Sequence, residues 1–359
     1  MKILRLSLLL VSSVMIFLFG NSYVQACSRV VYIGTDSLVV TGRNMDWQED
    51  MHSNIFIMPR GVERRGSLIQ NTMVWKAKYG SIITSSYDMG CSDGLNEKGL
   101  DANLLFLSES DYSRKNDSRP AMNIGLWAQY VLDNFATVHE AVEALSKEEF
   151  RIEAPNMPGG SKTTIHMSIS DAIGNSAILE YIDGNLVIHE GKEYQVMTNS
   201  PIFEKQLAIT EYWNWVGGVN MLPGTGRSSD RFARAAYYLK AVKKTADPKL
   251  AAAYVMSIMR NVSAPMDLST PEKKKSATQW RVLADQKNLI YYFDSAVTLN
   301  TFHVELKDLD FAEGAPYKEL KLSEGQVYPN NATKAFVKVP PVDFLKAQAA
   351  IMKKLGRTE

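Results

Sequence analysis

The residues from Val24 to Ser28 constrain this chain more than any other stretch, because they indicate where the folded protein begins. The preceding segment has the three parts of a secretory signal peptide: a basic start, an apolar run from Leu8 to Phe19, and small residues before Cys27. Cleavage after Ala26 would make Cys27 the first residue of the mature protein. One residue would then carry a thiol and a free α-amine, which is a nucleophile beside its own base. We therefore expect the rest of the chain to form the walls and the charge environment of that terminus.

The apolar run is too short for a membrane-spanning helix, which needs about 20 residues, and no later stretch is a better candidate. The sequence thus predicts a signal peptide over residues 1–26 that is removed on export. It predicts one domain over residues 27–359, without stable membrane insertion. Without Lys2 and Arg5, 38 basic side chains balance 39 acidic ones. This balance argues against binding to nucleic acid or to an anionic membrane surface.

The two cysteines, Cys27 and Cys91, leave two other readings of the terminus open. In an oxidising compartment they could form one structural disulfide, although a chain of this length does not need one. Bacterial lipoproteins also carry their acylated cysteine directly after the cleavage site, which would make the protein a non-enzymatic envelope anchor. Gln25 fits such a site poorly, because a small or apolar residue is usual there. The intact mass of the mature protein distinguishes a free, an acylated and a disulfide-bonded Cys27.

Hairpin patterns and helix pairs alternate along the chain. Turn signals at Gly34–Ser37 and Asp183-Gly184 predict hairpins, and strands are expected at residues 30–33, 38–41, 54–58, 81–84, 100–107, 163–169, 177–182, 186–189, 279–284, 289–293 and 301–306. Apolar residues at helical spacing, with a capping signature at Thr137 and Glu140, predict helices at residues 122–135, 137–145, 202–215, 230–243 and 249–259. Antiparallel hairpins joined to helix pairs favour an α+β fold, a layered sandwich with helices outside two sheets.

Catalysis at the N-terminus needs no separate histidine. An α-amine has a pKa of about 7.7–8.0, so near neutral pH it can accept the proton of the thiol, whose free pKa is about 8.5. None of the five histidines lies in a Cys-protease or zinc-site context; they are His52, His139, His166, His189 and His303. We therefore expect packing roles for the histidines on predicted helices and strands, and neither a metal nor another cofactor.

Four polar residues are candidate partners of Cys27. Arg43 and Asp46 follow the strand that pairs with the Cys27 strand, so the hairpin register would bring them beside the terminus. There the carboxylate would hold the amine and the guanidinium would favour the thiolate, with a surface ion pair as the alternative. Asn199, between a strand and a helix, is either a turn residue or an oxyanion donor. Arg231 lies in the helix after a glycine-rich loop and could face inward.

Taken together, these residues resemble the choloylglycine hydrolase family of N-terminal-nucleophile hydrolases, which includes bile salt hydrolases and penicillin V acylases. The resemblance covers most of the mature chain. It rests on the motifs CSR at 27–29, GRNMD at 42–46, LNEKGL at 95–100, VMTNSP at 196–201, LPG at 222–224 and SDRF at 229–232. It implies a four-layer αββα sandwich of two antiparallel sheets and hydrolysis of a non-peptide amide in a small-molecule substrate. It also implies Cys27 as the nucleophile, with Arg43, Asp46, Asn199 and Arg231 as its catalytic partners.

Trp47 and Phe106 resemble aromatic residues that line the acyl pocket in the Gram-negative branch of the family, although two aromatics are also common in an ordinary core. Phe106 cannot donate a side-chain hydrogen bond, so only a backbone N–H near it could join Asn199 in an oxyanion hole. The interval between Asn199 and Arg231 is shorter than in Gram-positive members, which use that segment for tetramer assembly. The oligomeric state therefore stays open, with a homo-oligomer among the options.

Export and this branch of the family together predict a periplasmic enzyme. The acyl part of its substrate should be bulky and apolar. Conjugated bile salts and penicillin V both fit this description, and long-chain N-acyl homoserine lactones form a third class. The resemblance does not choose between them.

Overall fold

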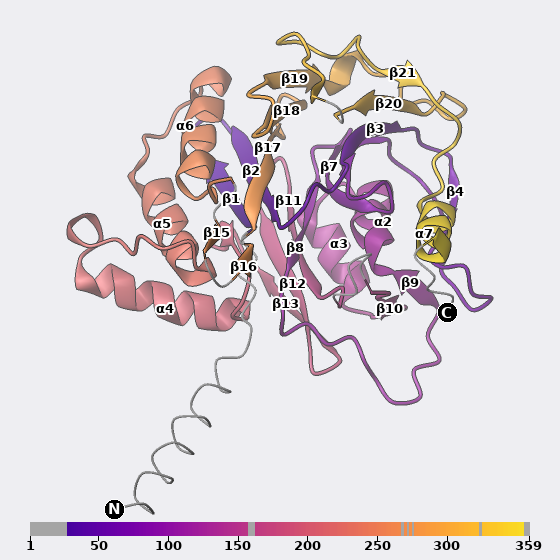
Figure 1. Cartoon of the computed structure of the whole chain (residues 1–359), viewed down its shortest axis with the longest axis horizontal. Helices are drawn as coiled ribbons and strands as arrows, with labels where there is room; N and C mark the ends of the chain where they lie inside the picture. The colour runs from indigo at the N-terminus through magenta and orange to yellow at the C-terminus, as the bar shows by residue number, and fades with distance from the viewer. Residues whose placement is uncertain are drawn as a thin grey trace, which may run out of the picture.

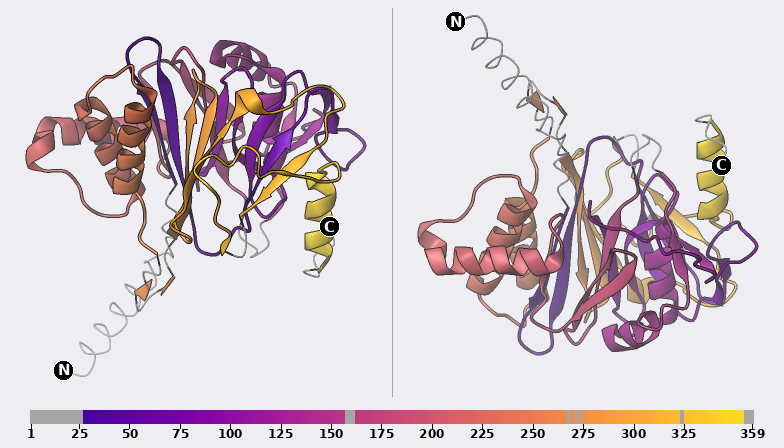
Figure 2. Two further views of the ribbon diagram at one scale, coloured as in Figure 1. Left: turned by 90° about the horizontal axis from the view of Figure 1, so that it is seen from above. Right: turned by 90° about the horizontal axis from the view of Figure 1, so that it is seen from below.

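A computed structural model describes residues 27–156, 162–266, 269–270, 273–274, 276–322 and 325–354. The predicted signal peptide lies outside these residues. Two antiparallel sheets form the centre of the molecule, and helices cover the outer face of each sheet (Figure 1; Figure 2). The predicted four-layer αββα sandwich is therefore confirmed.

The first sheet has six strands in the order β14-β1-β2-β17-β18-β19. Their bounds are Val196–Met197 (β14), Ser28–Ile33 (β1), Val39–Trp47 (β2), Ala277–Asp285 (β17), Ile290–Ser295 (β18) and Thr301–Glu305 (β19). Strand β1 pairs with β2 from Ser28↔Asn44 to Ile33↔Val39, so the first predicted hairpin is confirmed. Strand β1, which directly follows Cys27, thus lies inside the sheet, between β14 and β2, and not at its edge. Strand β2 runs further than expected, so Arg43 and Asp46 lie within it.

The second sheet has nine strands in the order β13-β12-β11-β8-β7-β6-β3-β20-β21. Their bounds are Asn185–Glu190 (β13), Ser176–Ile182 (β12), Ile165–Ser170 (β11), Asp101–Phe106 (β8), Cys91–Asn96 (β7), Ser81–Ser85 (β6), Asn54–Met58 (β3), Lys318–Lys321 (β20) and Val337–Lys338 (β21). Three two-stranded pairs lie outside the main sheets: β4 with β5 (Glu63–Arg65, Val74–Lys76), β9 with β10 (Ala121–Asn123, Arg151–Glu153) and β15 with β16 (Ser269–Thr270, Lys273–Lys274).

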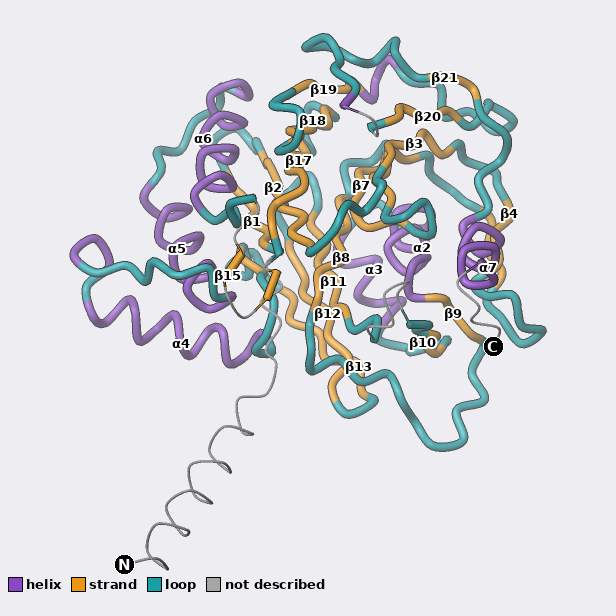
Figure 3. Tube along the Cα trace, viewed as in Figure 1, coloured by secondary structure: helices purple, strands orange, loops and turns teal. Residues whose placement is uncertain are grey.

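Helices α5 (Ser228–Ala241) and α6 (Pro248–Asn261) pack on the outer face of the six-stranded sheet, and α4 (Phe203–Val216) packs against α5 (Figure 3). Helices α2 (Trp127–Asn134) and α3 (Val138–Leu145) pack on the nine-stranded sheet, and α7 (Phe344–Lys354) contacts its β3 through Phe56 and Phe344. Short 3-10 turns are η2 (Ile124–Leu126), η3 (Gly218–Asn220) and η4 (Leu306–Asp308). No helix in the described ranges is long and apolar enough to cross a membrane.

Most helix predictions hold. Thr137 caps α3 by accepting from the Glu140 N–H, as the sequence indicated. The helix expected from residue 122 begins later, because β9 ends at Asn123, whose side chain caps η2 instead. Helix α7 was not predicted.

Two arginines of the six-stranded sheet reach across to the other sheet. Arg29 donates to the Ser176 hydroxyl at 2.9 Å and to the Ile169 carbonyl at 3.1 Å. Arg43 donates to the Leu104 carbonyl at 2.9 Å. Because buried polar groups are costly unless they are hydrogen-bonded, these contacts also fix how the two sheets lie against each other.

Candidate active site

An open cavity of about 810 Å³ lies at the start of β1, and the Cys27 thiol forms part of its wall. Most of its other lining side chains are apolar, and they include Met45, Trp47, Met51, Tyr87, Met89, Leu104, Phe106, Ile124 and Ile165. Trp47 and Phe106, which the sequence analysis assigned to an acyl pocket, both line it.

Cys27 is a buried thiol, 3% exposed, and its Sγ lies 3.7 Å from the carbonyl oxygen of Asp46. Burial raises the pKa of this thiol above its ordinary value, while the charges of Arg43 and Arg231 act to lower it. The thiol therefore depends on these two cations, and on a nearby base, to react as a thiolate. Cys91 lines the same cavity, and both cysteines are free, so the structure does not contain the alternative disulfide.

Arg43 holds its guanidinium at the cavity wall. One nitrogen, Nη2, donates to the Leu104 carbonyl, and the guanidinium carbon lies 4.6 Å from the centre of the Trp280 ring. Its Nε and Nη1 are buried and have no hydrogen-bond partner among the residues that the structure describes. These N–H groups are available to a thiolate or to a bound substrate.

The two carboxylate oxygens of Asp46 differ in their hydrogen bonding. Its Oδ1 accepts a hydrogen bond from the Thr278 hydroxyl at 2.5 Å. Its Oδ2 is buried without a hydrogen-bond partner in the described part of the chain. Burial raises the pKa of this carboxyl to about 6, against the opposing effects of Arg231, Thr278 and Arg43. A buried carboxylate oxygen without a partner is costly, so this site favours a cationic or N–H partner.

Arg231, on α5, ties the start of β1 to Asn199. Its Nη1 donates to the Cys27 carbonyl and to the Ser28 hydroxyl, each at 2.5 Å. Its Nη2 donates to Asn199 Oδ1 at 2.8 Å, and its Nε to the Gly226 carbonyl at 3.1 Å. Burial lowers the pKa of Arg231 to about 10, so the residue remains a cation at neutral pH. The inward orientation expected for this arginine is confirmed.

Asn199 lies beside the end of β8. Its Nδ2 donates to the Phe106 carbonyl at 2.7 Å. The N–H of the next residue, Leu107, donates to the Thr164 carbonyl and therefore points toward the β11 side of β8. Since N–H and C=O groups of one residue point to the same edge of an antiparallel strand, and alternate along it, the Phe106 N–H points to the edge where Asn199 lies. The side-chain amide and this backbone N–H thus face a common region.

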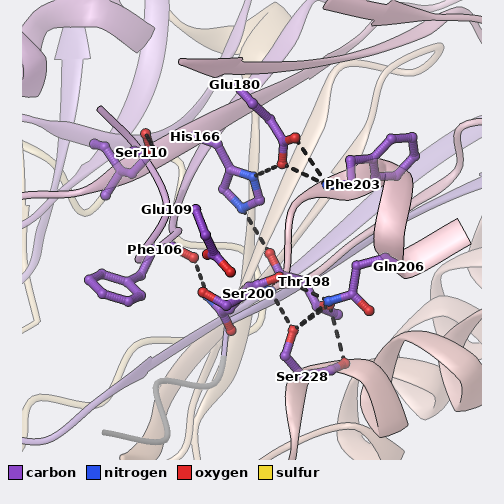
Figure 4. Close-up of polar contacts among 12 residues, drawn as sticks. Phe106, Glu109, Ser110, His166, Glu180, Thr198, Ser200, Phe203, Gln206 and Ser228 are labelled. Carbon is purple, nitrogen blue, oxygen red and sulfur yellow. Dashed lines mark hydrogen bonds and ion pairs between the residues drawn. The ribbon is translucent and has the colours of Figure 1, made fainter. Parts of the chain in front are cut away.

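A buried network holds the segment before Asn199 in place (Figure 4). His166 Nε2 lies 2.8 Å from the Thr198 carbonyl, and His166 Nδ1 lies 2.9 Å from Glu180 Oε1. Because a carbonyl can only accept, Nε2 carries a proton. Glu180 also accepts from the Phe203 N–H at the start of α4. His166 therefore has the packing role predicted for it, but one that bears on the site.

Ser228 and Gln206 complete this network. The Asn199 N–H donates to Ser228 Oγ at 2.8 Å, and Gln206 Nε2 donates to the Asn199 carbonyl at 2.9 Å. Sequence reasoning did not identify these residues. The strands predicted at residues 163–169 and 177–182 pair in the structure as β11 and β12, and their register, with Met167 opposite Leu179, places His166 opposite Glu180.

The structure brings all seven residues of the predicted site together. Cys27, Arg43, Trp47 and Phe106 line one cavity, while Asp46, Asn199 and Arg231 reach the same place through the contacts described above. Their chemical roles stay predictions. Across the described ranges, no group of three or more His, Cys, Asp or Glu side chains is arranged to hold a metal ion.

Comparison with known proteins gives the class of this chain. Residues 27–317 match the family described as linear amide C–N hydrolases, choloylglycine hydrolase family. Penicillin V acylase from Pectobacterium atrosepticum is 42% identical over 351 residues, which cover 90% of this chain and 93% of that protein. A bile salt hydrolase/transferase from Clostridium perfringens is 27% identical over 81% of this chain and 96% of its own.

A solved structure gives the same result. Penicillin V acylase from Agrobacterium tumefaciens is 46% identical and superimposes with a TM-score of 0.83, over 89% of this chain and 99% of that one. The chain therefore belongs to the choloylglycine hydrolase family, and it is an amidohydrolase of linear C–N bonds.

Proposed function

We propose that this protein is a periplasmic acylase whose nucleophile is Cys27, exposed as the first residue when residues 1–26 are removed, and that its preferred substrate is penicillin V or a related aryloxyacetyl amide. The observation that carries the proposal is the pairing of Cys27 with Asp46. The thiol lies beside the Asp46 backbone, and the carboxylate oxygen Oδ2 has no hydrogen-bond partner among the described residues. A free α-amine on Cys27 supplies the partner that this oxygen needs.

The reaction follows from these positions. The thiol proton passes to the α-amine, and the sulfur attacks the amide carbon of the substrate. Asn199 Nδ2 and the Phe106 N–H stabilise the oxyanion, and Arg43 stabilises the thiolate. The α-ammonium then gives its proton to the departing amine, which leaves a thioester. Water gives a proton to the same α-amine and attacks the thioester, and the thiol regains its proton when the acid leaves.

The cavity lining supports an aromatic acyl group. Trp47, Tyr87 and Phe106 line the same cavity as the thiol, and aromatic rings pack well edge-to-face against one another. Two relatives with more than 40% identity are penicillin V acylases. Conjugated bile salts are the second candidate, because the cavity is wide and apolar and a more distant relative is a bile salt hydrolase. N-acyl homoserine lactones follow as a third class.

The test combines the mass of the exported protein with turnover. A mass that begins at unmodified Cys27, with release of 6-aminopenicillanic acid from penicillin V, supports the proposal. Glycocholate, taurocholate and a long-chain N-acyl homoserine lactone, assayed in parallel, rank the substrates. Faster turnover of either bile salt would contradict the preference, and an acylated Cys27 without turnover would contradict the mechanism.

Two cysteine variants identify the nucleophile. Cys27→Ser should lose turnover and keep the fold, whereas Cys91→Ser, at the wall of the same cavity, should still turn over. Wild-type rates in Cys27→Ser would refute the proposed nucleophile.

A further inference from the structure

Strand β17 contains a β-bulge directly beside the site. Thr278 pairs with Asp46 and Trp280 pairs with the preceding residue, Met45, so that Gln279 is an extra residue in β17. In a regular strand, residues two apart point to the same face. The bulge changes this alternation, and Thr278 and Trp280 lie against neighbours on opposite faces of β2.

On one face, the Thr278 hydroxyl has a fixed direction. Its oxygen accepts from the Ala264 N–H at 2.9 Å, and it donates to Asp46 Oδ1 at 2.5 Å. A hydroxyl has one proton, and a carboxylate oxygen can only accept, so this proton points at Asp46. The Thr278 N–H also donates to the Ala264 carbonyl, at 3.0 Å. Thr278 is therefore held at both its backbone and its side chain.

On the other face, the Trp280 ring supports Arg43. The guanidinium carbon lies 4.6 Å from the ring centre, and the indole N–H donates to Ser53 Oγ at 3.0 Å, which fixes the plane of the ring. A guanidinium stacks well on a buried indole. Together with the Leu104 carbonyl, the ring positions Nε and Nη1 of Arg43, the two nitrogens without a hydrogen-bond partner among the described residues.

We propose that this bulge is a positioning device for the reaction, in which Thr278 turns Asp46 so that Oδ2 meets the Cys27 amine, and Trp280 holds Arg43 beside the thiol. The inference rests on the proposed function, because it describes how the amine and thiol of that mechanism are held. Neither residue needs to touch the substrate. Both act through a neighbour on β2.

Several charged groups face Asp46, and Thr278 acts among them. Arg231 approaches from α5, Arg281 from β17, Arg43 from the same strand, and the Cys27 thiol from β1. The three arginines and the Thr278 hydroxyl favour the carboxylate, while burial disfavours it. Removing the hydroxyl leaves Oδ1 without its donor, so Asp46 should ionise only at a higher pH.

The experiment measures kcat/KM for penicillin V against pH in Thr278→Val, which keeps the shape of the side chain and removes the hydroxyl. The acid limb of the profile should move up by roughly one pH unit, as expected when a carboxylate loses a charge-assisted donor. Activity should fall about fivefold at pH 6 and recover near pH 8. Thr278→Ser should restore the wild-type profile.

Thr301→Val is the matched control, because the Thr301 hydroxyl also donates to an aspartate, Asp294, on a neighbouring strand away from the cavity. Its profile should match wild type. An unmoved acid limb in Thr278→Val, an equal shift in the control, or a failed rescue by Thr278→Ser would each overturn the inference. If Thr278→Val does not fold, the pH profiles of Thr278→Ala and Thr278→Ser make the same comparison, because only the serine keeps the hydroxyl.

A second readout does not depend on the substrate. The rate at which iodoacetamide alkylates Cys27, located by peptide mass, reports the thiolate directly as a function of pH. Trp280→Leu should slow it several-fold, while Trp280→Phe, which keeps a ring, should not; equal rates in the two variants would refute the role of Trp280. A wild-type enzyme without turnover would count against the proposed function alone, since alkylation still tests the positioning of Arg43 and Asp46.

Discussion

Replacing Arg231 with lysine separates geometry from charge at the site. Within the described part of the chain, three nitrogens of Arg231 donate four hydrogen bonds, which reach Cys27, Ser28, Asn199 and Gly226. A lysine ammonium keeps the positive charge but presents its donors from one point, so it cannot span these four acceptors. The contact to Asn199 Oδ1, at 2.8 Å, fixes the amide that the mechanism uses as an oxyanion donor.

The expected loss follows from that amide. Removal of an oxyanion donor typically costs about 10²–10³ in kcat, or roughly 3–4 kcal/mol. We therefore expect Arg231→Lys to lower kcat for penicillin V by roughly 100-fold or more, with a smaller change in KM. Release of 6-aminopenicillanic acid at saturating substrate measures kcat, and thermal unfolding confirms that the variant is folded.

Arg234→Lys is the matched control on the same helix. Arg234 donates to the carbonyls of Pro223 and Thr225 in the preceding loop, neither of which lines the cavity. Its kcat should stay close to wild type. If Arg231→Lys retained kcat within about threefold of wild type, charge alone would suffice and the positioning argument would be wrong.

Three further outcomes follow from the structure. Because burial raises the pKa of Asp46 to about 6, kcat/KM should rise as the pH increases through 6 and Asp46 ionises. The same raised pKa means that the free energy of unfolding of the wild type should fall as the pH rises from about 4 to 6. Urea unfolding should show a smaller fall for Asp46→Asn over the same pH range. His166→Ala leaves Glu180 buried without its partner and should lower the free energy of unfolding by about 3–5 kcal/mol in urea, whereas a loss below about 1 kcal/mol would contradict the buried pair. Trp47→Ala should raise KM for penicillin V roughly tenfold, while Trp215→Ala, 84% exposed on α4, should leave the kinetics unchanged.

The local part of the site could be predicted from the sequence. A short turn fixes the register of the first hairpin, and that register places Arg43 and Asp46 next to the Cys27 strand. Asn199 and Arg231 were different, because Arg231 lies 204 residues from Cys27 and no local rule joins two such segments. The family resemblance alone connected them. Helix α7 was also missed, and only two of its residues, Phe344 and Leu345, are buried.

The supporting residues could not be found in this way. Thr278 and Trp280 owe their positions to one extra residue in β17, and a bulge has no reliable sequence signature when no glycine marks it. If β17 were a regular strand, the side chains of Thr278 and Trp280 would lie on the same face of the sheet. The sequence therefore predicted residues that the structure brings together, but it did not predict the neighbours that contact them.

The methionines of the cavity have a consequence for how this enzyme can change. Met45, Met51 and Met89 line the acyl space, and unbranched thioether side chains adjust to ligands of different shape. Beside them, Arg43 links the two sheets at the cavity wall through the Leu104 carbonyl. New acyl groups can thus be accommodated without moving the thiol, so the substrate range of such a protein can drift in evolution through single pocket substitutions while the chemistry stays constant.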